Sequence, residues 1–179
     1  MYQQRAITRV MESKHILSVE QFKELARPTS KHIDEGDVMT FVRECEEIKI
    51  IPAIGLEKFK KLLDEPEDSR NKILIEGGEY NDKCGKLKRC VGLQTTVAYF
   101  VYAHMVMVDG GMLTRTGLMQ HNDSYASREN DKNRVRLYDD AMNAAETYLS
   151  SCLAYIKATE KEDINPVRGT RIRFHAIGD

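Results

Sequence analysis

Cysteine and histidine are the residues of this chain with the most recognisable chemistry, and their spacing argues against a metal site. Cys84 and Cys90 enclose a lysine-rich stretch, whereas structural zinc is usually held by closely spaced cysteine pairs with further ligands nearby. No second pair follows, and the histidines form no HxH or HExxH arrangement; they are His15, His32, His104, His121 and His175. We therefore predict unpaired thiols, no metal and no other cofactor.

Acidic residues cluster at two places, Glu44 to Glu47 and Asp139 with Asp140. Metal sites in helical bundles combine such carboxylates with inward-facing Glu-x-x-His motifs, and this sequence has none, so we interpret both clusters as solvated helix faces. The sequence also lacks the Gly-x-Ser-x-Gly, P-loop and Gly-x-Gly-x-x-Gly motifs of nucleophilic catalysis and phosphate binding. We predict that the protein is not an enzyme.

Two short basic clusters are the remaining candidates for chemistry. Lys86, Lys88 and Arg89 form one, and the arginines near the C-terminus form the other: Arg168, Arg171 and Arg173. Either could contact a nucleic-acid backbone, but no aromatic platform for base stacking accompanies them. The net charge of the whole chain is only -1, so a general attraction to nucleic acid or an anionic membrane is not expected.

A long helix over residues 129–159 is the strongest structural signal. Apolar side chains recur there at steps of three and four, which places them on one helix face; they are Val135, Tyr138, Met142, Ala145, Leu149, Cys152 and Ile156. A second row lies beside the first: Ala141, Tyr148 and Tyr155. Two adjacent rows are typical of a helix seated in a core.

Further helices are expected before it. Ser18 with Gln21 forms a capping-box pattern for a short helix that stops before Pro28, and Asp34 or Asp37 caps the next, which we expect Pro52 to break. On that helix we expect one apolar face: Val38, Phe41, Val42, Cys45 and Ile48. A short amphipathic helix follows near residues 56–63. A second long helix is expected over 87–109, closed by Gly110-Gly111. Its second half is apolar all round, which marks it as the most enclosed helix of the domain.

Three segments are less regular. Residues 73–80 fit either a short strand with a hairpin turn or the end of a helix. Residues 111–128 read as a long connection without regular structure, of the kind that often makes contacts. In the tail, basic and apolar residues alternate from Arg171 to Ile177 with the period of a strand, and such a strand could pair with a neighbouring molecule.

The predicted fold is therefore all-α: a bundle of four to six helices, two of them long, with a small β-hairpin and an extended C-terminal arm. We divide the chain into an N-terminal arm or short helix (1–15), a helical domain (16–160) and the C-terminal arm (161–179). With 179 residues, 41% hydrophobic and 31% charged, it has the composition of a soluble globular protein. The longest apolar run, residues 97–108, is too short for a membrane span. Free thiols and the lack of a signal sequence predict a reducing, intracellular setting.

The order of these features resembles the head-tail connector (adaptor) proteins of tailed bacteriophages, in the version found in phages and prophages of Bacteroides-like hosts. The resemblance covers about residues 16–158. It rests mainly on the "IIPAIG" corner at residues 50–55 and on "GLQTTVAYFVYAHMV" at 92–106, which is followed by the Thr- and Gly-containing segment "GGMLTRTGLMQHNDSYAS".

This resemblance implies a virion structural protein that is assembled in the host cytoplasm. Such adaptors form a ring beneath the portal, by analogy with its twelvefold symmetry, and extend the DNA channel toward the tail. The implied partners are further copies of the chain, the portal protein, a neighbouring tail or neck ring protein and, without sequence specificity, DNA. The alternative is a small helical nucleic-acid-binding protein acting through Lys86, Lys88 and Arg89.

Intermolecular contacts are expected from the long connection and the tail, because neither has an obvious partner within a helical chain. The residues for which we predict contact with the portal or a neighbouring subunit are Thr114, Arg115, Thr116, Tyr125, Arg171, Arg173 and Phe174.

Overall fold

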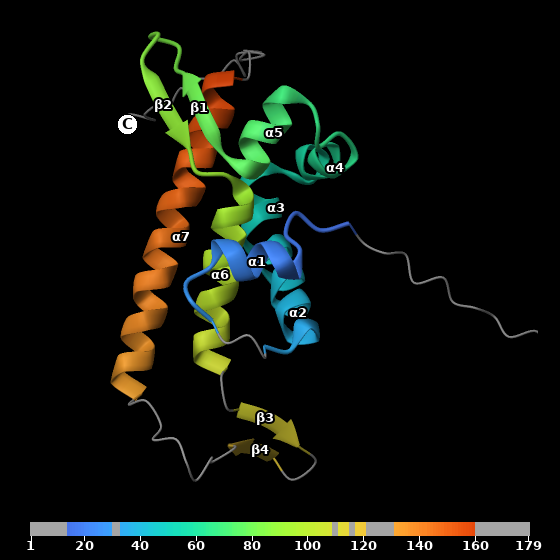
Figure 1. Ribbon diagram of the computed structural model, residues 1–179, viewed down its shortest axis with the longest axis vertical. Coiled ribbons are helices and arrows are strands. Elements are labelled where there is room, and N and C mark those ends of the chain that lie inside the picture. The colour runs from blue at the N-terminus through green and yellow to red at the C-terminus, as the bar shows by residue number, and fades with distance from the viewer. Residues whose placement is uncertain (1–13, 30–32, 109–110, 115–116, 121–130, 160–179) are drawn as a thin grey trace, which may run out of the picture.

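The computed structural model describes residues 14–29, 33–108, 111–114, 117–120 and 131–159, and over these ranges the chain is mainly helical (Figure 1). The helical elements are α1 (Val19–Leu25), α2 (Glu35–Cys45), the π-helix η1 (Glu46–Ile50), α3 (Ile51–Ile54), α4 (Leu56–Asp64), α5 (Ser69–Glu76), α6 (Leu93–Val108) and α7 (Asp131–Thr159). Two antiparallel hairpins pair β1 (Gly78–Asn81) with β2 (Leu87–Cys90) and β3 (Gly111–Thr114) with β4 (Gly117–Gln120). The predicted all-α class with a small hairpin is confirmed.

Helices α6 and α7 lie side by side and run in opposite directions, as Figure 1 shows. Helix α6 is the centre of the core, because α7, α2, α1 and α5 all pack against it. Its side chains at Val97, Phe100 and Val101 are completely buried. The sequence predicted α6 as the most enclosed helix, and this enclosure ends before its last turn, where Met107 and Val108 are 43% and 48% exposed.

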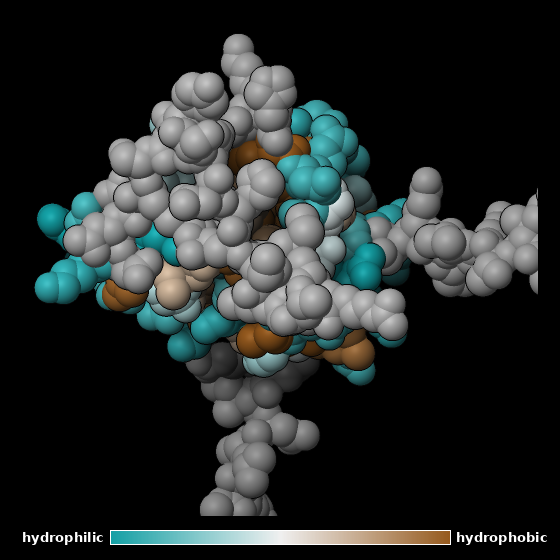
Figure 2. Space-filling model, turned by 90° about the horizontal axis from the view of Figure 1, so that it is seen from below, coloured by the Kyte–Doolittle hydropathy of each residue, from teal (hydrophilic) through white to brown (hydrophobic). Residues whose placement is uncertain are grey.

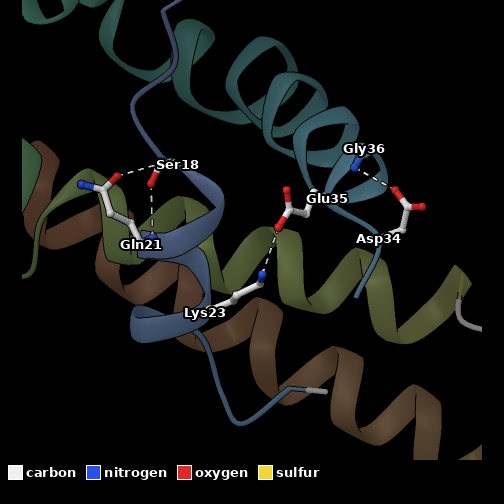
Figure 3. Close-up of polar contacts among 6 residues, drawn as sticks. All are labelled: Ser18, Gln21, Lys23, Asp34, Glu35 and Gly36. Atoms are coloured by element: carbon white, nitrogen blue, oxygen red, sulfur yellow. Dashed lines mark hydrogen bonds and ion pairs between the residues drawn. The ribbon is translucent and has the colours of Figure 1, made fainter. Parts of the chain in front are cut away.

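Both capping predictions at the N-terminal end of the domain are confirmed (Figure 3). The Ser18 hydroxyl accepts from the Gln21 N–H at 3.3 Å, and the Gln21 side chain accepts from the Ser18 N–H at 2.9 Å, which completes a capping box. Helix α2 is capped by Asp34, whose carboxylate accepts from the N–H groups of Gly36 and Asp37. These bonds satisfy donors that the first helical turn leaves without intrahelical partners.

The helix that begins with α2 does not break at Pro52, as the sequence suggested, but widens into η1 and continues to Ile54. Proline lacks an N–H and its ring collides with the preceding turn of an α-helix, and a π-turn relieves both constraints. The extra residue per turn rotates the following side chains. Ile48, expected on the buried face, is therefore 59% exposed, whereas Glu46 is 4% exposed.

The predicted helix start at Leu87 is also wrong, because residues 87–90 form β2 and α6 begins at Leu93. For residues 73–80, both alternatives contribute: α5 runs to Glu76 and β1 begins at Gly78. Between these elements the chain crosses itself at Gly77 and Gly92, both with φ of +97°. A Cβ at Gly92 would lie 2.6 Å from backbone atoms of residues 76 and 77, so only glycine permits this crossing.

The connection from α6 to α7 contains the hairpin β3–β4, where the sequence analysis expected no regular structure. The predicted closing helix is confirmed over the described residues Asp131–Thr159. Its buried face is concentrated in the second half, at Cys152, Tyr155 and Ile156. Val135, predicted as part of the apolar face, is 46% exposed. Within the described ranges no helix meets the length and hydropathy needed to cross a membrane.

Candidate functional site

Most of the residues predicted to contact partners lie outside the described residues. Thr114 ends β3, opposite Gly117 in the β3–β4 register. The others are not described; they are Arg115, Thr116, Tyr125, Arg171, Arg173 and Phe174. The arm at 161–179 and nearly all of the arm at 1–15 are likewise outside the described ranges, so these expectations stay predictions.

A groove with a volume of about 1180 Å³ lies at the β1–β2 end of the molecule. Helices α4 and α5, the β1–β2 turn and the last turn of α7 line it. Three carboxylates lie along it, at Glu57, Asp68 and Asp82, against six basic side chains: Lys58, Lys61, Arg70, Lys83, Lys88 and Lys157. The excess of positive charge makes the groove suited to an anionic partner.

The hairpin edge of this groove is held by Asp82. Its carboxylate accepts from the N–H groups of Lys86 and Cys84 and pairs with the Lys88 ammonium at 3.1 Å. The bond from the Lys86 backbone, followed by that from the Lys88 side chain, lowers the pKa of Asp82, and Asp82 in turn raises the pKa of Lys88. The negative charge of Asp82 thus offsets the positive charge of Lys88. This weakens the predicted cluster of Lys86, Lys88 and Arg89 as an independent anion site.

A pair of buried thiols lies at the foot of the same hairpin. Cys90 is the last residue of β2 and Cys152 lies on α7; both side chains are completely buried and their sulfurs are 3.7 Å apart. The Thr96 hydroxyl lies 3.8 Å from the Cys152 sulfur and donates to the Gly92 carbonyl at 2.8 Å. From the sequence, Cys84 and Cys90 were weighed together and predicted to be unpaired thiols, and Cys152 was placed on the apolar face of the closing helix; Cys84 is exposed and Cys45 is buried.

The two thiols differ in acidity because of their surroundings. The Cys90 thiol donates to the Cys152 sulfur, and this bond, with smaller contributions from Thr96, Gly92 and Ser151, lowers the pKa of Cys152 to about 7 against the opposing effect of burial. The same bond and burial raise the pKa of Cys90. A thiolate therefore forms at Cys152 first, and Thr96 can turn its proton from the Gly92 carbonyl toward that sulfur.

A second buried polar cluster joins the N-terminal segment to η1. Glu46 accepts from the Ile16 N–H at 2.8 Å and bonds to His15 Nδ1 at 2.7 Å. Gln94 donates to the Ile16 carbonyl at 3.1 Å. Ile16 is thus fixed at both of its backbone groups. We interpreted Glu46 from the sequence as surface-exposed, but it lies four residues after the buried Val42 and so continues the buried face of α2.

These features define a helical protein with two small hairpins, a basic groove and a buried thiol pair, and over the described residues no group of three or more His, Cys, Asp and Glu side chains could hold a metal ion. Residues 50–166 match a family of unknown function, DUF6712. The match spans well over half of the chain, and the protein belongs to this family. No curated protein and no solved structure matches it.

The matched residues begin at the end of η1 and include α3 to α7 and both hairpins. The groove and the thiol pair therefore lie entirely within the family region. Helices α1 and α2 and the bond between Glu46 and Ile16 precede it.

Proposed function

We propose that this protein is a ring-forming head-tail connector of a tailed bacteriophage, which joins the capsid to the tail at the portal vertex and extends the DNA channel. Its place is the neck of the virion, after assembly in the host cytoplasm. The proposal follows the sequence resemblance, and one feature of the structure supports it above others: the placement of the two hairpins.

The hairpins lie at opposite ends of the pair formed by α6 and α7 (Figure 1). Each consists of two strands only, and neither β1–β2 nor β3–β4 gains a third strand among the described residues. Each therefore presents two strand edges with unpaired backbone groups. Two-stranded hairpins are marginally stable by themselves, and open edges readily pair with another chain. Elements of this kind at both ends suit a subunit that contacts one ring above and another below.

Exposed apolar side chains accompany both hairpins. Leu87, on β2, is 67% exposed. Near the β3–β4 end, four side chains on the last turn of α6 and the first turns of α7 are at least 40% exposed: Met107, Val108, Val135 and Leu137. Figure 2, a view of this end from below, shows hydrophobic surface in several separate places. Such surface supports an interface with other subunits.

The predicted contact residues take their role from the same proposal. Thr114 belongs to the β3–β4 hairpin, and we propose that it, with Arg115, Thr116 and Tyr125, contacts the portal or a neighbouring copy. The tail residues Arg171, Arg173 and Phe174 are proposed to do the same. A net charge of -1 suits a channel wall along which DNA slides, since strong phosphate binding would retard it.

The test is the mass of the purified protein in solution, alone and mixed with its portal protein, by native mass spectrometry. A ring, or a monomer that forms a ring only on the portal, is expected. Leu87→Ser should weaken assembly, whereas Asn81→Ser, at the paired position on the same hairpin, should leave it unchanged. Deletion of residues 165–179 should prevent portal docking. A monomer indifferent to the portal would overturn the proposal.

A second candidate function is binding of nucleic acid, which the charge of the groove favours. Among the described residues, Lys61, Arg70 and Lys157 have no carboxylate within ion-pair distance, so they are available to phosphates. Duplex binding should then weaken steeply as salt increases. Charge reversal at Lys61 and Lys157 should abolish it, with Lys23→Glu, on α1, as the control. Equal affinity of all variants would exclude the groove as the site.

A further inference from the structure

We propose that Cys90 and Cys152 form a reversible disulfide that ties the foot of the β1–β2 hairpin to helix α7. Nothing in the family assignment points to this chemistry. It rests on the approach of two side chains that are 62 residues apart in the sequence.

The geometry needs only a small adjustment. The sulfurs are 3.7 Å apart, about 1.7 Å beyond the length of a disulfide bond. Rotation about χ1 moves a cysteine sulfur by more than this without moving the backbone. The two sulfurs already approach one another in the core, one at the end of β2 and the other in the second half of α7.

The surroundings favour one direction of attack. The hydroxyl of Thr96 lies 3.8 Å from the Cys152 sulfur, and the backbone of Val91, next to Cys90, donates to the Ser151 hydroxyl at 3.3 Å. The Cys90 thiol and the Thr96 hydroxyl therefore lie next to the Cys152 sulfur, and the ionised form of Cys152 is the better stabilised of the two thiolates. A thiolate is the reactive form of cysteine, so Cys152 is the nucleophile and Cys90 the resolving thiol.

With a peroxide as oxidant, the reaction proceeds in two steps. The Cys152 thiolate attacks one peroxide oxygen, the O–O bond breaks, and Cys152 becomes a sulfenic acid while the other oxygen leaves as hydroxide and takes up a proton. The Cys90 sulfur then attacks the Cys152 sulfur, the S–O bond breaks, and water leaves with the Cys90 proton. Overall, two thiols lose two electrons and two protons, and the peroxide is reduced to two waters.

The bond would limit movement of the hairpin. In the reduced protein, the foot of β2 is attached to α7 through packing and the bond between Val91 and Ser151. In the oxidised protein it is attached covalently, and the closed loop of more than sixty residues constrains the unfolded chain. If the proposed connector role is correct, subunits would assemble reduced in the cytoplasm and become stapled after release of the particle, since virion surfaces are oxidising. Only this consequence rests on the proposed function.

The test uses the full-length chain in a Cys84→Ser background, so that the exposed thiol cannot join two molecules. The folded protein is treated with hydrogen peroxide, alkylated, digested with trypsin without reduction and analysed by mass spectrometry. The expected product is a linked pair of peptides, residues 90–115 and 137–157, in most chains. The oxidised protein should also melt higher, by on the order of 10 °C, and reductant should reverse the shift.

Two variants distinguish the roles. Cys152→Ser should remove the linked peptide, and Cys90→Ser should leave a sulfenic acid on Cys152 that a dione probe captures. Cys45→Ser, at another buried thiol, should form the link as before. The proposal is overturned if folded protein yields alkylated Cys90 and Cys152 without a link. It is equally overturned if the link forms only after denaturation. Because the parent protein gives the decisive result, a variant that fails to fold does not affect the conclusion.

Discussion

Replacing Glu46 with alanine is expected to destabilise the fold by about 2–3 kcal/mol. One carboxylate oxygen accepts from the buried Ile16 N–H at 2.8 Å, and a buried donor left without its acceptor costs about 1–3 kcal/mol. The bond to His15 Nδ1 adds to this loss, because the His15 side chain is only 12% exposed. For a domain with a stability of about 5–15 kcal/mol, this loss is large.

The assay is equilibrium unfolding in urea, with a parallel thermal melt in which we expect a decrease in Tm of about 5–10 °C. Glu46→Gln keeps an oxygen that can accept from Ile16 and should lose about 1 kcal/mol. Glu47→Ala changes the exposed neighbour on the same π-turn and should stay within about 0.5 kcal/mol of the parent protein. If Glu46→Ala also stays within that limit, the buried carboxylate does not hold the N-terminal segment.

Two further measurements test the contacts of Ile16 independently of the total stability. Gln94 donates to the Ile16 carbonyl, and Glu46 accepts from the Ile16 N–H. Because the two bonds fix one residue, Gln94→Ala and Glu46→Ala should be non-additive in a double-mutant cycle. Amide exchange of Ile16 should become much faster in Glu46→Ala while exchange within α6 follows the global stability. Additive effects with unchanged exchange of Ile16 would contradict the structural interpretation.

Three further predictions concern the hairpin and its foot. Gly92→Ala should lower the free energy of unfolding in urea by about 3 kcal/mol, because φ is +97° and the new Cβ meets backbone atoms at 2.6 Å. Gly85→Ala, with φ of +74° and open space around the new Cβ, should lower it by only about 1 kcal/mol. Equal losses would show that the crossing is not tight. Tyr155→Phe should lose about 1 kcal/mol, because its hydroxyl donates to the Arg70 carbonyl at 3.0 Å, and an unchanged urea midpoint would argue against this bond. The pKa of Cys152 falls from 9.0 to about 7 on folding, so the folded chain releases this proton at lower pH than the unfolded chain does. The free energy of unfolding should therefore rise from pH 7 to pH 9, and this gain should be lost as pH falls through 7. A rise that persists in Cys152→Ser would have another origin.

Local sequence rules predicted the two capped helix starts, at Ser18 and Asp34, correctly. The caps at Ser18 and Asp34 need only a side-chain oxygen and the next few N–H groups, so the information is contained in adjacent residues. The long helix over residues 131–159 was recognisable because its apolar period persists over many turns. Such features depend little on what the rest of the chain does.

Interactions between distant segments were harder to predict. Ile48 lies on the apolar face of an ideal α-helix, but the π-turn rotates it outward, and no simple period describes that change. Residues 87–90 were predicted as the start of a helix because the strand they form is too short to show its own period. The pairing of this strand with β1 depends on the crossing of the chain at Gly77 and Gly92, which the local sequence does not indicate. The approach of Cys90 to Cys152 depends on the same crossing, and the spacing in the sequence carries no signal of it.

The distribution of these features suggests where the common role of the family lies. The family match begins at residue 50, so the bond from Glu46 to Ile16, which stabilises the N-terminal segment on α6, is not part of the matched region. The basic groove, both hairpins and the pair Cys90–Cys152 are within it. Three of these features meet at one end, because β2 lines the groove through Lys88 and ends at Cys90 two residues later. A change in the attachment of this hairpin to α7 would therefore alter the groove and the open strand edges together.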